Sequence, residues 1–197
     1  MIVEEQLFSC YGLSILPTSE VGIDGLNGEF YSGRRYVIKG MNNDQWRLLE
    51  LFFQRGISES SGQVYWYNRF YCQTDQMWFS QSVINTNLGN WLAVNDEPLL
   101  DYCSLIKRVV LHDLKLSGYL HEPPYRIDVE KIASLAIASF LFQSKGMILI
   151  GELHDKDLSS SEKGYWKQFI EDSPCCVIFK DHPPSDYNLD CEIINYG

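Results

Sequence analysis

The sequence lacks the features that identify metal-binding, secreted and membrane-spanning proteins. Its six cysteines include no C-x-x-C pair, so neither a zinc site nor a disulfide framework is indicated, and we expect reduced thiols packed in the interior. The longest apolar run, residues 132–142, falls short of the ~20 residues that a membrane span needs. Residues 1–6 carry two acids and no basic residue, unlike a secretory signal. We therefore expect a cytoplasmic protein without a metal site.

Positive charge is also scarce. The chain of 197 residues has 16 lysines and arginines against 26 aspartates and glutamates, a formal net charge of −10. This balance offers little to a phosphate backbone or an anionic lipid surface, so we expect no nucleic acid partner and no direct membrane insertion. Hydrophobic residues make up 45% of the chain, enough for a packed core. With no internal repeat, the chain is expected to form a single domain over residues 1–197.

Strand and helix signals alternate along the chain. Stretches with the composition of strands are residues 6–16, 22–28, 35–39, 60–67, 147–150 and 175–180. Stretches with helical periodicity are residues 45–54, 83–120, 129–142 and 160–172, the last opened by a capping box of Ser159 and Glu162. This alternation predicts an α/β fold with a largely parallel central sheet.

Several short motifs follow one another in a characteristic order. A strand leads into a turn at Gly40 and a helix, and the stretches Ser61–Trp66 and Phe79–Ser82 come next. After a long helix follow Ile148–Glu152 and Val177–His182. Over residues 20–185 this order resembles the ATP-binding subunits of ABC transporters, and within them the short subunits that drive export of capsular polysaccharide and O-antigen.

The resemblance implies the ABC ATPase fold of the P-loop NTPase type. Its expected parts are a mostly parallel central sheet, an N-terminal antiparallel β part, and a helical subdomain over about residues 82–143. The same resemblance implies where nucleotide-binding residues would lie, and each motif can be compared with what this sequence has there.

The phosphate loop of the family, G-x-x-x-x-G-K-[ST], aligns with a run that has lost its defining residues. The aligned positions are Gly40, Asn42, Asn43, Asp44, Gln45, Trp46 and Arg47. Trp46 replaces the lysine that reaches the β- and γ-phosphates, and Arg47 replaces the hydroxyl that holds Mg²⁺. Gln45 replaces the second glycine, and Asp44 adds negative charge where phosphate would sit. Taken without the resemblance, this run is an ordinary strand–turn–helix connection with a capped helix.

Three further positions keep the residue type of the family. Glu152 matches the glutamate that polarises the attacking water, although Gly151 replaces the aspartate that binds Mg²⁺. His182 matches the histidine that senses the γ-phosphate, and Gln81 matches the glutamine that links nucleotide to the membrane partner. Each of these residues is also common at strand ends and in loops without any catalytic role.

The family's signature, which covers the nucleotide of a paired subunit, has two alignments. Residues Leu116–Gly118 read like its beginning, but they lie too far before Gly151 for one helix and one strand. Counting back from Glu152 without gaps places the signature on Asp128, Val129 and Glu130. On this preferred alignment, acidic side chains would face a phosphate and repel it.

These losses leave three hypotheses for function. The first is a non-hydrolysing pseudo-ATPase that binds no cofactor and acts through protein contacts with a membrane permease subunit or an active ABC ATPase subunit. The second is an ATP-binding subunit with altered chemistry, using MgATP, Glu152 and His182. The third is an acidic interaction or inhibitor protein unrelated to transport. A homodimer is an alternative assembly, and binding to the inner face of the membrane would be peripheral.

Two other chemistries are not supported. The pairs His112–Asp113, His154–Asp155 and Asp181–His182 could suggest a metal phosphohydrolase, but that site needs ligands that converge from helices. A serine or cysteine nucleophile would be expected on a G-x-S-x-G turn, which the sequence lacks.

Overall fold

The computed structural model describes most of the chain in two compact units. The described residues are 4–16, 20–54, 57, 60–67, 72–75, 103–123, 126–143, 146–153, 158–183, 187 and 189–197. The first unit comprises residues 1–74, 145–152 and 174–197, and the second comprises residues 75–144 and 153–173. Within the described residues, no helix is both long and apolar enough to cross a membrane.

The first unit contains an antiparallel sheet of three strands. These are β1 (Gln6–Ile15), β2 (Ile23–Tyr31) and β4 (Ser60–Trp66), in the order β2-β1-β4. Cys10 lies opposite Gly28 on one side and Val64 on the other. One face of the sheet is buried by apolar side chains such as Phe8 and Phe30, and the other carries the exposed Tyr11 and Tyr65. This alternation is typical of a sheet covered on one side.

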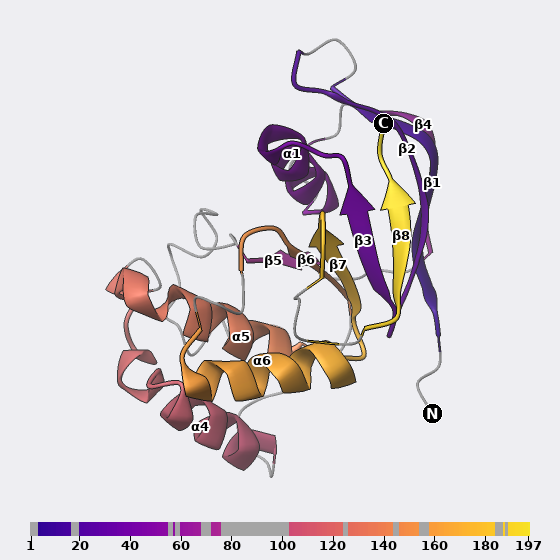
Figure 1. Ribbon diagram of the computed structural model, residues 1–197. Helices are drawn as coiled ribbons and strands as arrows, with labels where there is room; N and C mark the ends of the chain where they lie inside the picture. Colours follow the sequence, from indigo (N-terminus) through magenta and orange to yellow (C-terminus); the bar gives the residue numbers. More distant parts are fainter. Residues whose placement is uncertain are drawn as a thin grey trace. The chain divides into compact units, whose positions relative to one another are not determined.

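A parallel sheet of five strands forms the rest of the β structure in the first unit (Figure 1). Its strands are β5 (Cys72–Thr74), β6 (Met147–Ile150), β7 (Cys176–Lys180), β3 (Arg35–Lys39) and β8 (Cys191–Asn195), in the order β5-β6-β7-β3-β8. All pairs are parallel, so the carboxyl ends of the strands meet at one edge. The predicted parallel sheet and N-terminal antiparallel part are both confirmed.

Helix α1 (Asn43–Phe53) packs its apolar face into the core of this unit. Phe52 and Phe53 are buried beside Phe8, whose ring centroid lies 4.9 Å from that of Phe53 in an edge-on arrangement. Such aromatic pairs add to the apolar area that burial removes from water. The helix is thereby fixed against β1 and β2, directly after the turn that follows β3.

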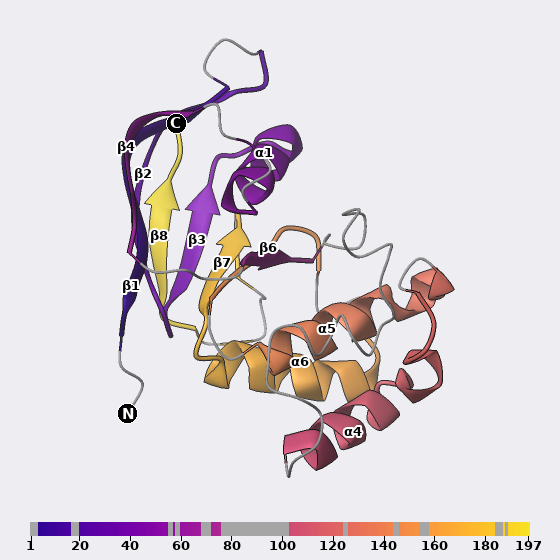
Figure 2. The same cartoon turned by 180° about the vertical axis from the view of Figure 1, so that it is seen from behind.

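The second unit is helical in its described part (Figure 2). It contains α4 (Cys103–Asp113), α5 (Ile132–Phe142) and α6 (Ser160–Asp172). Phe140 of α5 lies 5.3 Å from Phe169 of α6 between ring centroids, and Trp166 is fully buried beside them. The capping box of Ser159 and Glu162 opens α6 as predicted.

Three elements differ from the prediction. Residues 129–131 form a short 3-10 turn, and the α-helix begins only at Ile132, because Lys131 provides no side-chain cap there. Strands β5 and β8 had no strand signal in the sequence; they are short and pair along one or both sides with strands from distant segments. Residues 76–102, which include much of the predicted helical stretch, lie outside the described residues.

Candidate nucleotide site

The turn after β3 is built on a glycine that no other residue could replace. Gly40 has a φ of +93°, and a Cβ there would collide with the backbone oxygen of Tyr196. Tyr196 in turn donates its backbone N–H to the Lys39 oxygen at 2.8 Å. Gly40 donates weakly to Asp181 Oδ1 at 3.4 Å, which ties the turn to the end of β7. The position of the predicted phosphate loop is therefore closely enclosed by the chain itself.

The first turn of α1 is closed by its own side chains. Asn42 Oδ1 accepts from the Gln45 backbone N–H at 2.8 Å, and Gln45 Oε1 accepts from the Asn42 backbone N–H at 3.1 Å. A phosphate bound at a helix N-terminus needs such N–H groups as donors. In this capping box two of them are already occupied, so the start of α1 lacks the free donors of a phosphate cradle.

Trp46 fills the space in which the family places its lysine. The residue is only 4% exposed, and its indole Nε1 donates to Glu50 Oε1 at 3.0 Å. Its ring lies against Gly151, where an added Cβ would stand 2.8 Å from the indole Cδ1 and closer still to Nε1. The two positions that would hold the nucleotide phosphates and Mg²⁺ are therefore in contact with each other. The site is occupied by protein.

The other residues of the run point outward or bind neighbours. Asp44 is exposed, and Asn43 accepts a hydrogen bond from Lys180 Nζ. The guanidinium of Arg47 is about half exposed and lies 3.9 Å from Glu50 Oε2. Arg47 therefore already faces a buried carboxylate.

The family-like residues after β6 and β7 lie at the same sheet edge as the turn. β6 and β7 pair with Ile150 opposite Phe179, and β7 and β3 pair with Lys180 opposite Ile38. Gly40, Gly151 and Asp181 each follow the end of one of these strands. Glu152 and His182 are exposed there. Gln81 lies outside the described residues.

The preferred signature residues belong to the second unit. Asp128 Oδ2 accepts from the Tyr119 hydroxyl at 2.9 Å, and the carboxylate next to it raises the pKa of Tyr119. Glu130 is exposed, and Val129 opens the short 3-10 turn before α5. Asp128 is thus held by a local partner.

The residues present do not fit MgATP bound in the way the resemblance implies. The lysine position holds a buried indole, the helix start is capped, and the aspartate position is a glycine under that indole. Among the described residues, no group of three or more His, Cys, Asp or Glu side chains could hold a metal ion. We therefore derive no reaction step through a nucleotide or a metal.

Sequence reasoning missed Glu50 and Tyr196. Glu50 is 3% exposed and holds the Trp46 indole; its position four residues after Trp46 on a helix was the available signal. Tyr196 closes over Gly40 from beyond β8, and no local pattern indicates that contact.

Comparison with known proteins places this geometry on a familiar fold. No family model matches the chain, and no curated protein matches it in sequence. Among solved structures, an ATP-binding subunit of an ABC transporter is similar with a TM-score of 0.65 and 12% identity, covering 89% of this chain and 79% of that one.

Two other similar structures cover both chains more fully. A Pyrococcus furiosus protein assigned as an ABC transporter ATP-binding protein has a TM-score of 0.62 and 10% identity, over 98% of each chain. The ADP conformation of an ATP-binding cassette of an ABC transporter has a TM-score of 0.60 and 12% identity, over 98% of this chain and 90% of that one. The chain therefore has the fold of an ABC transporter ATP-binding cassette.

Proposed function

We propose that this chain is a non-hydrolysing pseudo-ATPase of the ABC type, which uses the fold to contact other proteins. The observation that carries the proposal is the packing of the Trp46 indole on Gly151. Together these residues fill the place in which the family binds phosphate and Mg²⁺. A fold by itself does not supply an activity, so the filled site decides between binding and catalysis.

The energetics favour the filled site over a bound nucleotide. Removing a buried tryptophan side chain from a protein core destabilises the fold by about 3–5 kcal/mol. A ligand that must displace Trp46 would lose that free energy from its own binding. Cellular ATP at millimolar concentration gains only about 4 kcal/mol from a millimolar Kd. Displacement of Trp46 by ATP is therefore unfavourable.

The proposed partners follow from the fold. ABC-type subunits work beside a membrane permease subunit or another ABC ATPase subunit, and we propose one of these as the partner. The order of the motifs favours a polysaccharide-export system, and the protein would then work in the cytoplasm, peripherally at the inner face of the membrane. The acidic net charge of −10 argues against nucleic acid as a partner.

One alternative is an ATP-binding subunit with altered chemistry. It is favoured by the placement of Glu152 and His182 after neighbouring strands at one sheet edge, where a base and a phosphate sensor would be needed. In that case Arg47 would have to leave Glu50 and supply the missing positive charge.

Titration calorimetry with MgATP tests the proposal. The purified protein should give no heat at millimolar nucleotide, and its melting temperature should not change, since a ligand that does not bind the native state cannot stabilise it. Saturable binding with a Kd below ~1 mM would contradict the proposal and favour the alternative. A variant carrying Trp46→Lys, Arg47→Ser and Gly151→Asp restores the family's residues at three positions. Gained affinity in this variant would show that those three positions exclude the nucleotide.

A further inference from the structure

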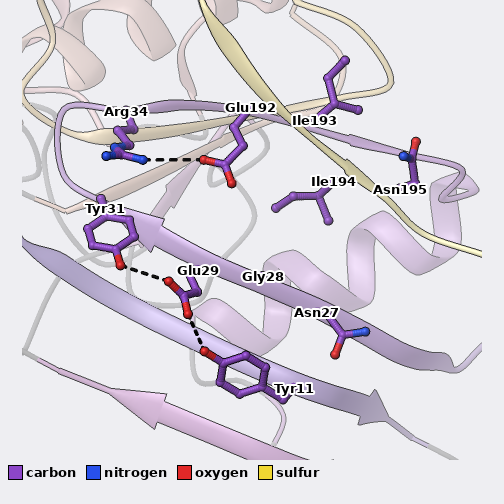
Figure 3. A pocket seen from close by; sticks show the side chains of 10 residues that line it. All are labelled: Tyr11, Asn27, Gly28, Glu29, Tyr31, Arg34, Glu192, Ile193, Ile194 and Asn195. Carbon is purple, nitrogen blue, oxygen red and sulfur yellow. Dashed lines mark hydrogen bonds and ion pairs between the residues drawn. The ribbon is translucent and has the colours of Figure 1, made fainter.

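A groove of about 650 Å³ lies within the first unit, between strand β8 and the outer face of β2 (Figure 3). Its walls come from the C-terminal strand, from β2, and from Tyr11 of β1. The volume is in the range of ligand sites, and the groove is open to solvent. It involves none of the residues of the candidate nucleotide site.

One wall of the groove is a strand edge. Among the described strands β8 pairs with β3 alone. The backbone N–H of Tyr196 points to β3, where it donates to Lys39 O. Since the amides of a strand alternate in direction, those of Ile193 and Asn195 point away from β3, toward the open edge. This edge can receive a further strand.

The side chain of Ile193 supports a covered edge. It is 54% exposed, and Figure 3 shows it pointing away from β2, while Ile194 on the same strand faces β2. Soluble proteins usually protect an edge strand with charges, proline or a covering segment, because an exposed apolar edge pairs with other chains. An isoleucine at this position indicates an edge that is meant to pair.

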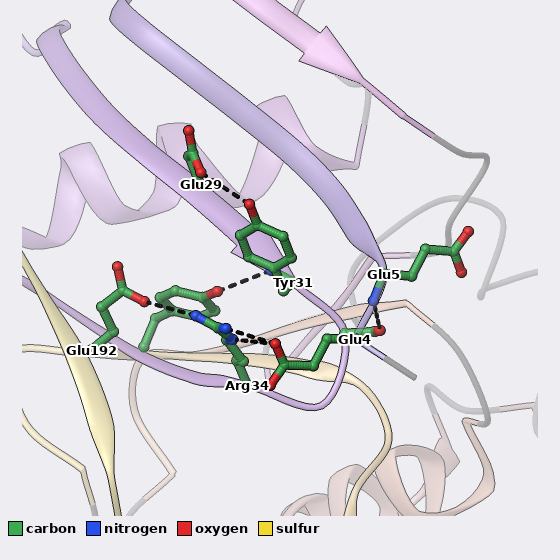
Figure 4. A network of polar contacts seen from close by, with 8 residues as sticks. Glu4, Glu5, Glu29, Tyr31, Arg34 and Glu192 are labelled. Atoms are coloured by element: carbon green, nitrogen blue, oxygen red, sulfur yellow. Dashed lines mark hydrogen bonds and ion pairs between the residues drawn. The ribbon is translucent and has the colours of Figure 1, made fainter. Parts of the chain in front are cut away.

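The groove and its rim are acidic. Arg34 lies between two carboxylates, with Nη2 2.6 Å from Glu4 Oε2 and Nη1 3.7 Å from Glu192 Oε2 (Figure 4). A third carboxylate, Glu29, has no cationic partner among the contacts of the described residues. The three carboxylates outnumber the one guanidinium, so a positively charged segment complements this surface.

Glu29 is preorganised to receive a cation. Its Oε1 accepts from the Tyr11 hydroxyl, and its Oε2 accepts from the Tyr31 hydroxyl at 3.0 Å. A carboxylate has about four acceptor sites, so two remain for a ligand. The exposed ring of Tyr11 offers a face to lysine or arginine, as the Tyr31 ring already does to Arg34 at 4.9 Å.

We propose that this groove binds an extended segment of a partner protein, bearing lysine or arginine, as a strand added to the edge of β8. Backbone pairing along β8 gives the segment its direction, and Glu29 and Glu192 select its charge. A segment of about five residues matches the length of β8. The inference rests on the proposed function only in that the chain acts through protein contacts.

Fluorescence anisotropy with labelled peptides tests the groove. The probe is a short peptide of alternating lysine and valine, and the matched control alternates glutamate and valine. We expect saturable binding of the basic peptide and at least tenfold weaker binding of the acidic one. Equal binding of the two, or no binding of the basic peptide, would overturn the proposal.

Variants separate backbone pairing from charge. Ile193→Pro removes an outward amide on an edge strand, where proline is tolerated, and should weaken the basic peptide at least tenfold, whereas Ile193→Val should not. Glu29→Gln and Glu192→Gln should each weaken it about two- to fivefold. Asp172→Asn, an exposed change on α6 with the same effect on net charge, should leave affinity unchanged. Circular dichroism melts confirm that each variant is folded.

Two further readings keep this proposal distinct from others. Unchanged affinity in Ile193→Pro and in both glutamate variants would mean non-specific attraction and would overturn the proposal. A wild-type dimer that Ile193→Pro converts to monomer, seen by sedimentation, would assign the edge to a second copy of this chain instead. MgATP calorimetry on the same sample is independent of both: nucleotide binding would overturn the pseudo-ATPase while leaving the peptide result intact.

Discussion

Gly151 lies directly against the indole of Trp46, although the two residues come from distant parts of the chain. A Cβ on Gly151 would stand 2.8 Å from the indole Cδ1. Glycine and tryptophan are therefore complementary in volume at these two positions: a side chain at one excludes the other. The two replacements act as one structural unit, and their dependence on each other is measurable.

Gly151→Ala should destabilise the wild-type protein by about 1–3 kcal/mol, because the methyl group overpacks a filled space. In a Trp46→Val background, which lacks the indole, the same change should cost much less. Urea denaturation of the four proteins gives the coupling free energy of this double-mutant cycle. A coupling near zero would mean that the indole does not lie on Gly151.

Gly164→Ala is the matched control for that cycle. Gly164 lies in the middle of α6 with open space where its Cβ would be. Alanine there should stabilise the protein by about 0.5–1 kcal/mol through helix propensity, in either background. A loss of stability would show that α6 is more crowded than described.

Trp46→Phe should destabilise the fold by about 1–3 kcal/mol, because it removes the N–H donor from the buried Glu50 carboxylate. Arg47→Ala, on the exposed side of the same helix, should change stability by less than about 0.5 kcal/mol. Chemical denaturation monitored by circular dichroism compares the two. Equal effects of both changes would contradict the role assigned to the indole hydrogen bond.

Glu162 should make stability depend on pH in the acidic range. Burial raises the pKa of this carboxyl, but hydrogen bonds from Ser134 and Ser159 outweigh burial and hold the pKa below its usual value. A lowered native pKa stabilises the fold above the unfolded value of ~4.3, and the contribution disappears as the pH falls through the native pKa.

Glu162→Gln tests this, since glutamine keeps the capping box without titrating. Between about pH 6 and pH 3 the wild type should lose more stability than the variant, measured by urea titration at each pH. Parallel pH profiles would exclude Glu162 as a source of the acid sensitivity.

Glu29 should titrate below the ordinary range of a glutamate. Hydrogen bonds from Tyr11 first, and from Tyr31, lower the pKa of Glu29. Tyr11→Phe and Tyr31→Phe should each raise that pKa, and the double variant should raise it furthest. Carboxyl carbon shifts in an NMR titration measure it directly. Tyr65→Phe, on the neighbouring strand, is the control and should leave the pKa of Glu29 unchanged.

The local elements of the site could be predicted from the sequence. The β3–Gly40 turn, the cap at Asn42 and the helix that carries Trp46 each follow from a few adjacent residues, and the structure has all of them. The capping box at Ser159 has the same origin. Signals of this kind depend on neighbours in the chain, which is why they were readable.

The contacts that close the site could not be predicted in this way. Trp46 meets Gly151 only because β7 separates β3 from β6 in the sheet, an order that no local pattern encodes. β8 has five residues with an irregular burial pattern, so its strand signal is weak, and with it the groove was missed. The sequence could name the replaced residues but not what they now touch.

The capped start of α1 also bears on how long the protein persists in a cell. A protein that needs a ligand to complete its native state is stabilised in proportion to the ligand's concentration, so its abundance follows supply. Here Asn42 and Gln45 satisfy the helix start from within the chain. The lifetime of this protein should therefore be indifferent to the energy charge of the cell, and respond to the abundance of its protein partner instead.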